Sequence, residues 1–211
     1  MVQHLQKPCV AIFCAPSHRL IAAALGNLCE QQGLKTYLLG NSDDEVTKFF
    51  DQIKKDGGRL VLVVHGGGDW RSQSAMECTA SDLESSWRSI CHVGSRIGQE
   101  AIRVMTSAGS GTLLFLGHVS ATQTQAGCAA LGAAQAGLRS FAQSMAREFG
   151  PKGVHVVYAK LGTDSGEQLA GSRAKAVALV CWQLHRQHPS TWTHEIDLRP
   201  AGTETLIASA V

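Results

Sequence analysis

The sequence predicts an α/β protein built as a single-domain, doubly wound parallel sheet. Short apolar runs alternate along the chain with amphipathic helical patterns, which is typical of strands joined by crossover helices. The runs are apolar throughout instead of alternating with polar residues, as expected for strands covered by helices on both faces. No linker, repeat or low-complexity tract interrupts the chain, so we expect one domain over residues 1–211.

The first half of the chain alternates clearly between the two patterns. We expect strand 8–15, helix 20–32, strand 35–40, helix 43–55 and strand 59–65. The first strand is the run PCVAIFCA, and Gly33 stops the amphipathic pattern that follows it. Asn41 or Ser42 is the expected N-cap of the second helix, because either side chain can accept a hydrogen bond from an amide of the first turn.

The second half begins with the longest helical pattern. We expect helix 82–106, strand 111–117, helix 129–149, strand 154–161, helix 171–185 and strand 195–198. Ser81 is the expected N-cap of the long helix, and Gly150-Pro151 ends the helix 129–149. Ligands of such sheets bind at the carboxyl ends of the strands, so we expect the site in the loops that follow the strands.

Composition argues against several classes of partner. The 19 Lys and Arg against 17 Asp and Glu give +2 without any basic run, so we expect no nucleic-acid partner. No apolar stretch approaches the roughly 18 residues that span a bilayer, so we expect no membrane partner. The first residues, MVQHLQKP, contain no apolar signal region, and the seven cysteines include no CxxC pair. Both observations indicate a cytoplasmic protein with reduced thiols.

Two segments carry a resemblance to a known family. GTLLFLGHVSATQTQAGCAALGAAQAGLRSFAQSMAREFGPKGVHVV (111–157) and WQLHRQHPSTWTHEIDLRP (182–200) resemble the short-chain dehydrogenase/reductase family. The stretch VLVVHGGG matches the position of that family's NNAG motif, and the resemblance covers nearly the whole chain. It implies a Rossmann-like fold and a homodimer through helices 82–106 and 129–149, which form a four-helix interface in the family.

The residues on which the family's redox chemistry depends are all replaced. The resemblance places the catalytic Tyr at Leu131, the Lys at Gln135, the Ser at His118 and the Asn at Ile90. A leucine cannot transfer a proton, and Gln135 supplies no positive charge that would lower the pKa of a neighbouring hydroxyl.

The cofactor segments are altered as well. Pro16, Leu20 and Ala22 stand at the positions of the family's phosphate-binding glycines, and Pro16 has no amide hydrogen to donate. One βα unit that would form the adenosine pocket is missing between residues 40 and 59, and the substrate lid after residue 161 is shortened. We therefore expect no nicotinamide cofactor.

Histidines and a carboxylate follow the expected strands instead. His118, His65 and Asp164 are the candidate catalytic residues, since imidazole and carboxylate exchange protons near neutral pH without a cofactor. The candidate substrate-binding residues are His18, Ser120, Leu131, Gln135, Lys160 and Thr163. No histidine pair at the site has helical ligand spacing, so we expect no metal. We expect the remaining histidines on the scaffold or surface: His4, His92, His155, His185, His188 and His194.

Three functions remain open on the sequence alone. The first is a cofactor-independent enzyme that isomerises, eliminates or cyclises a small-molecule ligand in the former substrate pocket. The second is a non-catalytic binding or assembly module, and the third is an atypical NAD(P)-dependent oxidoreductase. The run HGGGD at 65–69 is similar to the oxyanion loop of lipases, but no GxSxG nucleophile motif accompanies it.

Overall fold

The computed structural model describes residues 7–68, 70–162 and 171–200. Six parallel strands form one sheet in the order β2-β1-β3-β4-β5-β6. Their bounds are β1 Cys9–Cys14, β2 Lys35–Leu39, β3 Leu60–Gly66, β4 Gly111–His118, β5 Val154–Leu161 and β6 Glu195–Leu198. The predicted strands are confirmed, and each end agrees to within one residue.

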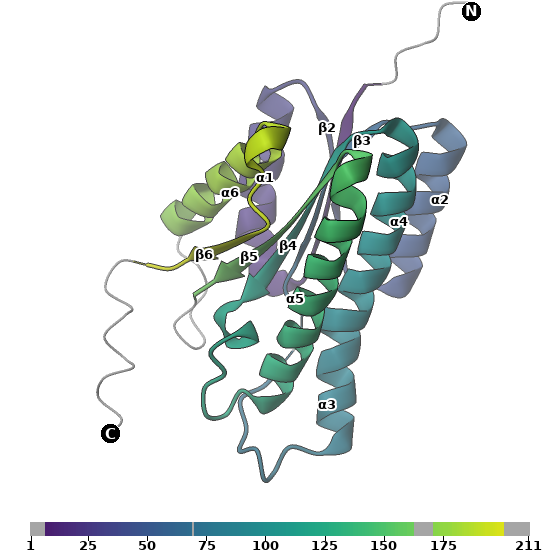
Figure 1. Cartoon of the computed structure of the whole chain (residues 1–211). Helices are drawn as coiled ribbons and strands as arrows, with labels where there is room; N and C mark the ends of the chain where they lie inside the picture. Colours follow the sequence, from purple (N-terminus) through teal and green to yellow (C-terminus); the bar gives the residue numbers. More distant parts are fainter. Residues whose placement is uncertain (1–6, 69, 163–170, 201–211) are drawn as a thin grey trace, which may run out of the picture.

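Helices cover both faces of the sheet, which confirms the doubly wound architecture (Figure 1). One face carries α1 Arg19–Gln31 and α6 Gly171–His185, which pack against each other. The other face carries α2 Asp43–Asp56, α4 Val93–Ala108 and α5 Ala129–Phe149. Between β2 and β3 the chain forms only α2, so the segment expected to lack a βα unit holds a single helix.

The long helix begins earlier than expected and is not continuous. Thr79, not Ser81, is the N-cap: its hydroxyl accepts from the Asp82 amide at 3.2 Å, and Asp82 accepts from the Thr79 amide at 3.0 Å. This reciprocal capping box is reinforced by Arg71, which pairs with Asp82, so it prevails over a box starting at Ser81. The segment α3 Ala80–Ser86 then passes through a π-helical turn, Trp87–His92, into α4. Ser42 caps α2, one of the two predicted positions.

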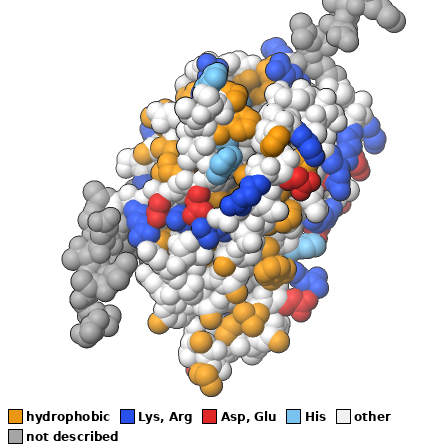
Figure 2. All heavy atoms as spheres, viewed as in Figure 1, with side chains coloured by type: hydrophobic (Ala, Val, Ile, Leu, Met, Phe, Trp, Pro, Cys, Tyr) orange, Lys and Arg blue, Asp and Glu red, His pale blue; other side chains and the backbone are white. Residues whose placement is uncertain are grey.

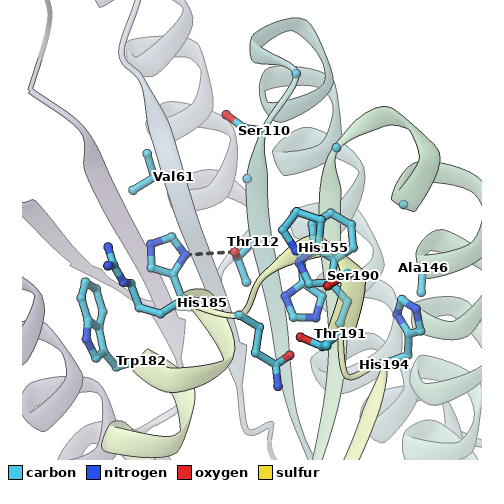
Figure 3. Close-up of a pocket in the computed structure, with 18 of the residues that line it drawn as sticks. Val61, Ser110, Thr112, Ala146, His155, Trp182, His185, Ser190, Thr191 and His194 are labelled. Atoms are coloured by element: carbon cyan, nitrogen blue, oxygen red, sulfur yellow. Dashed lines mark hydrogen bonds between the residues drawn. The ribbon is translucent and has the colours of Figure 1, made fainter.

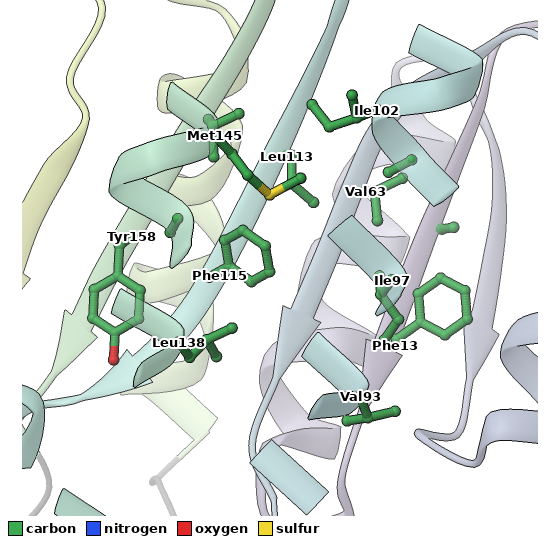
Figure 4. Packing of buried hydrophobic residues seen from close by; sticks show 14 of the residues in the cluster. Phe13, Val63, Val93, Ile97, Ile102, Leu113, Phe115, Leu138, Met145 and Tyr158 are labelled. Atoms are coloured by element: carbon green, nitrogen blue, oxygen red, sulfur yellow. The ribbon is translucent and has the colours of Figure 1, made fainter. Parts of the chain in front are cut away.

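Large apolar side chains fill the space between the sheet and the α4–α5 layer (Figure 4). Phe13, Phe115 and Tyr158 are fully buried there, where each aromatic ring contributes on the order of 2 kcal/mol by leaving water. Glycines on α4 permit a close approach to the strands. A Cβ at Gly98 would lie 3.0 Å from Cζ of Phe115, and one at Gly94 would lie 2.9 Å from the ring of His65. The α4 backbone therefore rests directly on β3 and β4.

All seven cysteines are free thiols, as expected. Among the residues that the structure describes, no helix is both long enough and apolar enough to cross a membrane.

Candidate functional site

Three histidines come from the carboxyl ends of three neighbouring strands. His65 lies near the end of β3, His118 is the last residue of β4, and His18 ends a 3₁₀ turn, Pro16–His18, directly after β1. Strand order reverses between β1 and β3, which is where parallel sheets open a crevice for ligands. The fold thus brings these predicted site residues to one region.

The ring of His118 has a defined tautomer. Its Nδ1 accepts a hydrogen bond from the Ser120 amide at 3.1 Å, and the Ser120 hydroxyl lies 2.8 Å away. Because the amide can only donate, the proton of the neutral ring resides on Nε2. Burial lowers the pKa of His118, so the ring is neutral at physiological pH. A neutral imidazole held in this way is a hydrogen-bond donor through Nε2.

His18 packs against the glycine turn that follows β3. A Cβ at Gly67 would lie 2.6 Å from Nδ1 of His18, and Gly67 itself has a positive φ of 79°. Nδ1 lies 3.0 Å from the Ser17 hydroxyl, whereas Nε2 makes no hydrogen bond to the described residues. Burial, and then the neighbouring His118, lower the pKa of His18 to about 4. The two rings are therefore close enough for protonation of His118 to oppose protonation of His18.

His65 lies beneath this region instead of lining it. Its side chain is 1% exposed and faces Gly94 and Phe115, with the His65 and Phe115 ring centroids 6.3 Å apart. Neither ring nitrogen makes a hydrogen bond within the described part of the chain. Burial and then His18 lower the pKa of His65 to about 4, while the nearby Ile90 carbonyl opposes this shift without hydrogen-bonding geometry. A ligand at the sheet edge would not touch this ring.

Gln135 and Leu131 are buried in the α5 layer. Leu131 is 2% exposed and Gln135 is 4% exposed. The amide oxygen of Gln135 accepts hydrogen bonds from the Tyr158 hydroxyl at 2.7 Å and from the His118 amide at 3.2 Å. Gly117 makes room for this contact, because a Cβ there would lie 2.0 Å from the tyrosine oxygen. Gln135 thus fixes the backbone of His118.

Lys160 is directed toward β6 and away from the three histidines. Its ammonium lies 3.1 Å from Glu195 and 3.7 Å from Asp197, and Glu195 also accepts from Arg139 at 2.9 Å. These ion pairs tie the short edge strand to β5 and α5. The remaining predicted site residues, Thr163 and Asp164, lie outside the described residues.

A cleft of about 720 Å³ lies at the carboxyl ends of β1 and β2. It is lined by strand-end residues, by Arg19 and Ala22 of α1, by the loop residues Gly40, Asn41 and Ser42, and by Glu45 of α2. This volume suits a small molecule. The loops that follow β1 and β2 form its walls, where the sequence predicts a ligand site, but none of the described candidate site residues lines it.

Comparison with known proteins gives consistent results. A family profile described as enoyl-(acyl carrier protein) reductase matches residues 21–173. The chain is 26% identical over 168 residues to a cyclic-di-GMP-binding biofilm dispersal mediator protein of Escherichia coli, covering 78% of this chain and 69% of that protein. A 3-oxoacyl-(acyl-carrier-protein) reductase of Buchnera aphidicola is 27% identical over 148 residues, covering 63% of this chain and 59% of the reductase.

A crystal structure of a short-chain dehydrogenase from Rhodopseudomonas palustris superposes with a TM-score of 0.76 at 27% identity, covering 92% of this chain and 98% of that one. The chain belongs to the short-chain dehydrogenase/reductase family. The Buchnera reductase is longer than the matched region, since this chain spans 59% of its length.

The nicotinamide cofactor of short-chain dehydrogenases does not fit the residues found at its usual position. Pro16 opens the turn after β1 without an amide hydrogen, and the side chain of Leu20 is 41% exposed at the first turn of α1. The HGGG turn packs closely against the π-helical turn, because a Cβ at Gly68 would lie 2.3 Å from the side chain of Ile90. The amide oxygen of Gln135 already accepts two hydrogen bonds, and this side chain, at the position of the family's lysine, carries no charge.

Sequence reasoning missed the Gln135–Tyr158 contact. A buried tyrosine in a strand needs a partner for its hydroxyl. The chain has two tyrosines, Tyr37 and Tyr158, and both lie in expected strands. That requirement was the available signal, but the sequence could not say which polar group would meet it.

Proposed function

We propose that this short-chain dehydrogenase relative catalyses a cofactor-independent proton transfer on a small carbonyl compound. His118 would donate a hydrogen bond to the carbonyl oxygen, and His18 would act as the base. The observation that carries the proposal is the fixed tautomer of His118, whose Nδ1 accepts from the Ser120 amide so that Nε2 bears the proton. In the family a serine at this position polarises the carbonyl, and a neutral imidazole can do the same.

The step is balanced without a redox partner. Nε2 of His18 removes a proton from the carbon beside the carbonyl, and the C–H electron pair moves into the new C=C bond of an enolate. Nε2–H of His118 stabilises the oxygen that receives the charge. The proton on His18 is replaced by one from solvent, which returns to the same carbon as the C=O bond re-forms, so that this carbon exchanges its hydrogen with water. In a β,γ-unsaturated carbonyl compound the proton returns instead to the γ carbon of the dienolate, which moves the C=C bond and completes an isomerisation.

The pKa of His18, about 4, suits this role. Carboxylates of similar pKa serve as bases for carbon acids in other enzymes. His18 is unprotonated at neutral pH, so the rate should be constant above about pH 5 and should fall as the pH drops through 4.

Hydrogen exchange tests the proposal without knowledge of the substrate. The purified protein is incubated in D₂O with a carbonyl-rich metabolite extract, and mass spectrometry records which compounds gain deuterium. We expect one or a few carbonyl compounds to gain one mass unit faster than in a heat-denatured sample. No enhanced exchange would overturn the proposal, and exchange that requires added NADPH would favour the oxidoreductase reading.

Nicotinamide nucleotides are expected not to bind. The reason is the missing amide donor at Pro16 and the absence of a cation at Gln135. Isothermal titration with NAD, NADH, NADP and NADPH measures this directly, and we expect no heat of binding at millimolar nucleotide. Binding of any of the four below about 0.1 mM would contradict this prediction.

A homodimer through helices 82–106 and 129–149 remains a proposal. Figure 2 shows hydrophobic side chains at the end of the molecule where α3 and the start of α5 lie. Leu83 and Trp87 are 43% and 47% exposed there, although monomeric surfaces rarely display such groups together. Light scattering is expected to give twice the 22.4 kDa chain mass.

The variant Leu83→Glu is expected to yield the monomer, because a dimer contact would bury the new charge. Leu179→Glu is the matched control, since Leu179 is 49% exposed on α6, on the other face of the sheet. A monomeric wild type, or equal effects of the two variants, would show that this surface is not the interface.

A further inference from the structure

A second cavity lies at the opposite edge of the sheet, where the strands begin. It is an open groove of about 1110 Å³ formed by the loops before β4 and β5, the end of α6 and the segment 187–194. Figure 3 shows Trp182 and His185 on one side of it, and His194 and Ala146 on the other. Nothing in the proposed chemistry at the carboxyl edge uses this groove.

The groove is lined by positively charged side chains and by no described carboxylate. Arg59, Arg147 and Arg186 line it, and no Asp or Glu is among its described lining residues. None of the three arginines makes an ion pair to a described carboxylate, although elsewhere Arg71, Arg88, Arg96, Arg103, Arg139 and Arg199 do so. Three guanidinium groups from separate segments around one hollow favour a multivalent anion, and guanidinium groups bind phosphate in a bidentate manner.

Aromatic rings provide the second feature. The ring of Trp192 stacks on His155 with centroids 4.8 Å apart and planes inclined by 5°. Trp182 lies against His185 at 5.3 Å, and His185 is held by the Thr112 hydroxyl at 2.9 Å. Both tryptophans are therefore held in fixed orientations at the groove wall, where they offer apolar surface to a flat ring.

His155 supplies an unsatisfied polar atom. Its side chain is 1% exposed, and its Nε2 lies 2.9 Å from the carbonyl oxygen of Thr193, to which it can only donate. Nδ1 is buried and makes no hydrogen bond within the described residues, although the Leu184 backbone lies near the ring, so in the neutral ring it is an acceptor without a donor. Such orphaned atoms are rare in protein interiors.

We propose that this groove binds a small organic phosphate carrying a flat ring, of the nucleoside phosphate class. The arginines would hold the phosphates, and the tryptophan side chains would contact the ring. The segment that closes one side of the groove is itself braced, because Gln187 and Thr193 exchange two hydrogen bonds of 2.8 and 2.9 Å. The site is separate from the histidines at the carboxyl edge, so it can be tested on its own.

Titration of the full chain with ADP, adenosine and inorganic pyrophosphate tests the proposal. The readouts are calorimetry at low salt and the indole N–H signals of the four tryptophans in a ¹⁵N spectrum. We expect ADP to bind at least tenfold more tightly than either fragment. The signals of Trp182 and Trp192 should shift, while those of Trp70 and Trp87 should not. Equal affinity for ADP and pyrophosphate would overturn the ring contact, and absence of ADP binding would overturn the site.

Charge-neutralising variants locate the binding site. Arg59→Gln and Arg186→Gln are each expected to weaken ADP binding about tenfold. Arg88→Gln is the control, because Arg88 is exposed and pairs with Glu84 on α3 away from the groove. Arg19→Gln alters the cleft at the carboxyl edge. If Arg19→Gln weakens binding and the groove variants do not, ADP occupies that cleft and the proposal is wrong.

Discussion

The variant His118→Asn is expected to lower the deuterium exchange catalysed by this protein at least about 100-fold, the usual loss when one positioned proton donor is removed. Asparagine is chosen because its side-chain oxygen can still accept the Ser120 amide hydrogen bond that Nδ1 of His118 accepts at 3.1 Å. The turn is thereby preserved, while the N–H that would face the carbonyl is lost. Comparison of initial exchange rates for the most strongly labelled compound gives the effect.

The chain contains a matched control for this experiment. His188 and Ser190 repeat the same local arrangement, with the Ser190 amide donating to Nδ1 of His188 at 3.3 Å and the hydroxyl 2.8 Å away. His188→Asn is expected to leave exchange unchanged, because this turn precedes β6 and lies outside the carboxyl edge. A loss of exchange in both variants would point to a general effect on folding, and no loss in His118→Asn would remove His118 from the mechanism.

The base is tested separately. His18→Gln is expected to reduce exchange and to abolish the fall in rate near pH 4, since that fall reports protonation of His18. An unchanged pH profile in this variant would assign the base to another residue.

Acid sensitivity of the fold is expected to fall when His65 is replaced by leucine. His65 stays neutral in the folded protein because burial lowers its pKa from 6.5 to about 4, whereas the unfolded chain takes up the proton normally. The stability that depends on this residue is fully present above pH 6.5 and is lost as the pH falls toward 4. Linkage gives a loss of about 2 kcal/mol between pH 7.5 and 5.

The variant removes that loss and has a second effect. At pH 7.5 it should increase the free energy of unfolding by about 1–3 kcal/mol, because two buried nitrogens without hydrogen bonds are replaced by apolar surface. Urea unfolding at pH 7.5 and at pH 5 measures both effects. His92→Gln is the control, because the side chain of His92 is half-exposed on the π-helical turn. This variant is expected to show the same difference in free energy of unfolding between the two pH values as the wild type. If His65→Leu and the wild type lose the same free energy of unfolding between pH 7.5 and pH 5, the acid sensitivity does not come from His65.

Strand and helix positions could be predicted because each depends on local patterns. The apolar runs are uniform, and Gly33, Ser42 and the Gly150-Pro151 pair mark boundaries that the structure reproduces closely. The predicted N-cap of the long helix, Ser81, was wrong. Two possible capping boxes overlap there, one that begins at Thr79 and one that begins at Ser81. Gln73 and Arg71, which both donate to Asp82, support the box that begins at Thr79.

Parallel topology also predicted that His18, His65 and His118 would meet, since the carboxyl ends of neighbouring parallel strands share one edge. It predicted a catalytic role for His65, but the structure buries this ring below the other two. His65 and Val63 lie two residues apart on β3, so their side chains point to the same face of the sheet. Because the side chain of Val63 packs under α4, that of His65 is buried there as well.

The sequence by itself therefore determined the fold class and the element order, whereas the replacement of the family's redox residues stays a prediction from the resemblance. The tertiary structure alone decided that Gln135 holds His118 through its amide oxygen, that Lys160 pairs with β6, and that three arginines without described carboxylate partners surround one groove. Secondary structure follows from interactions within a few residues. Hydrogen-bond partners and surface charge depend on segments that are dozens of positions apart, and only the folded chain brings them together.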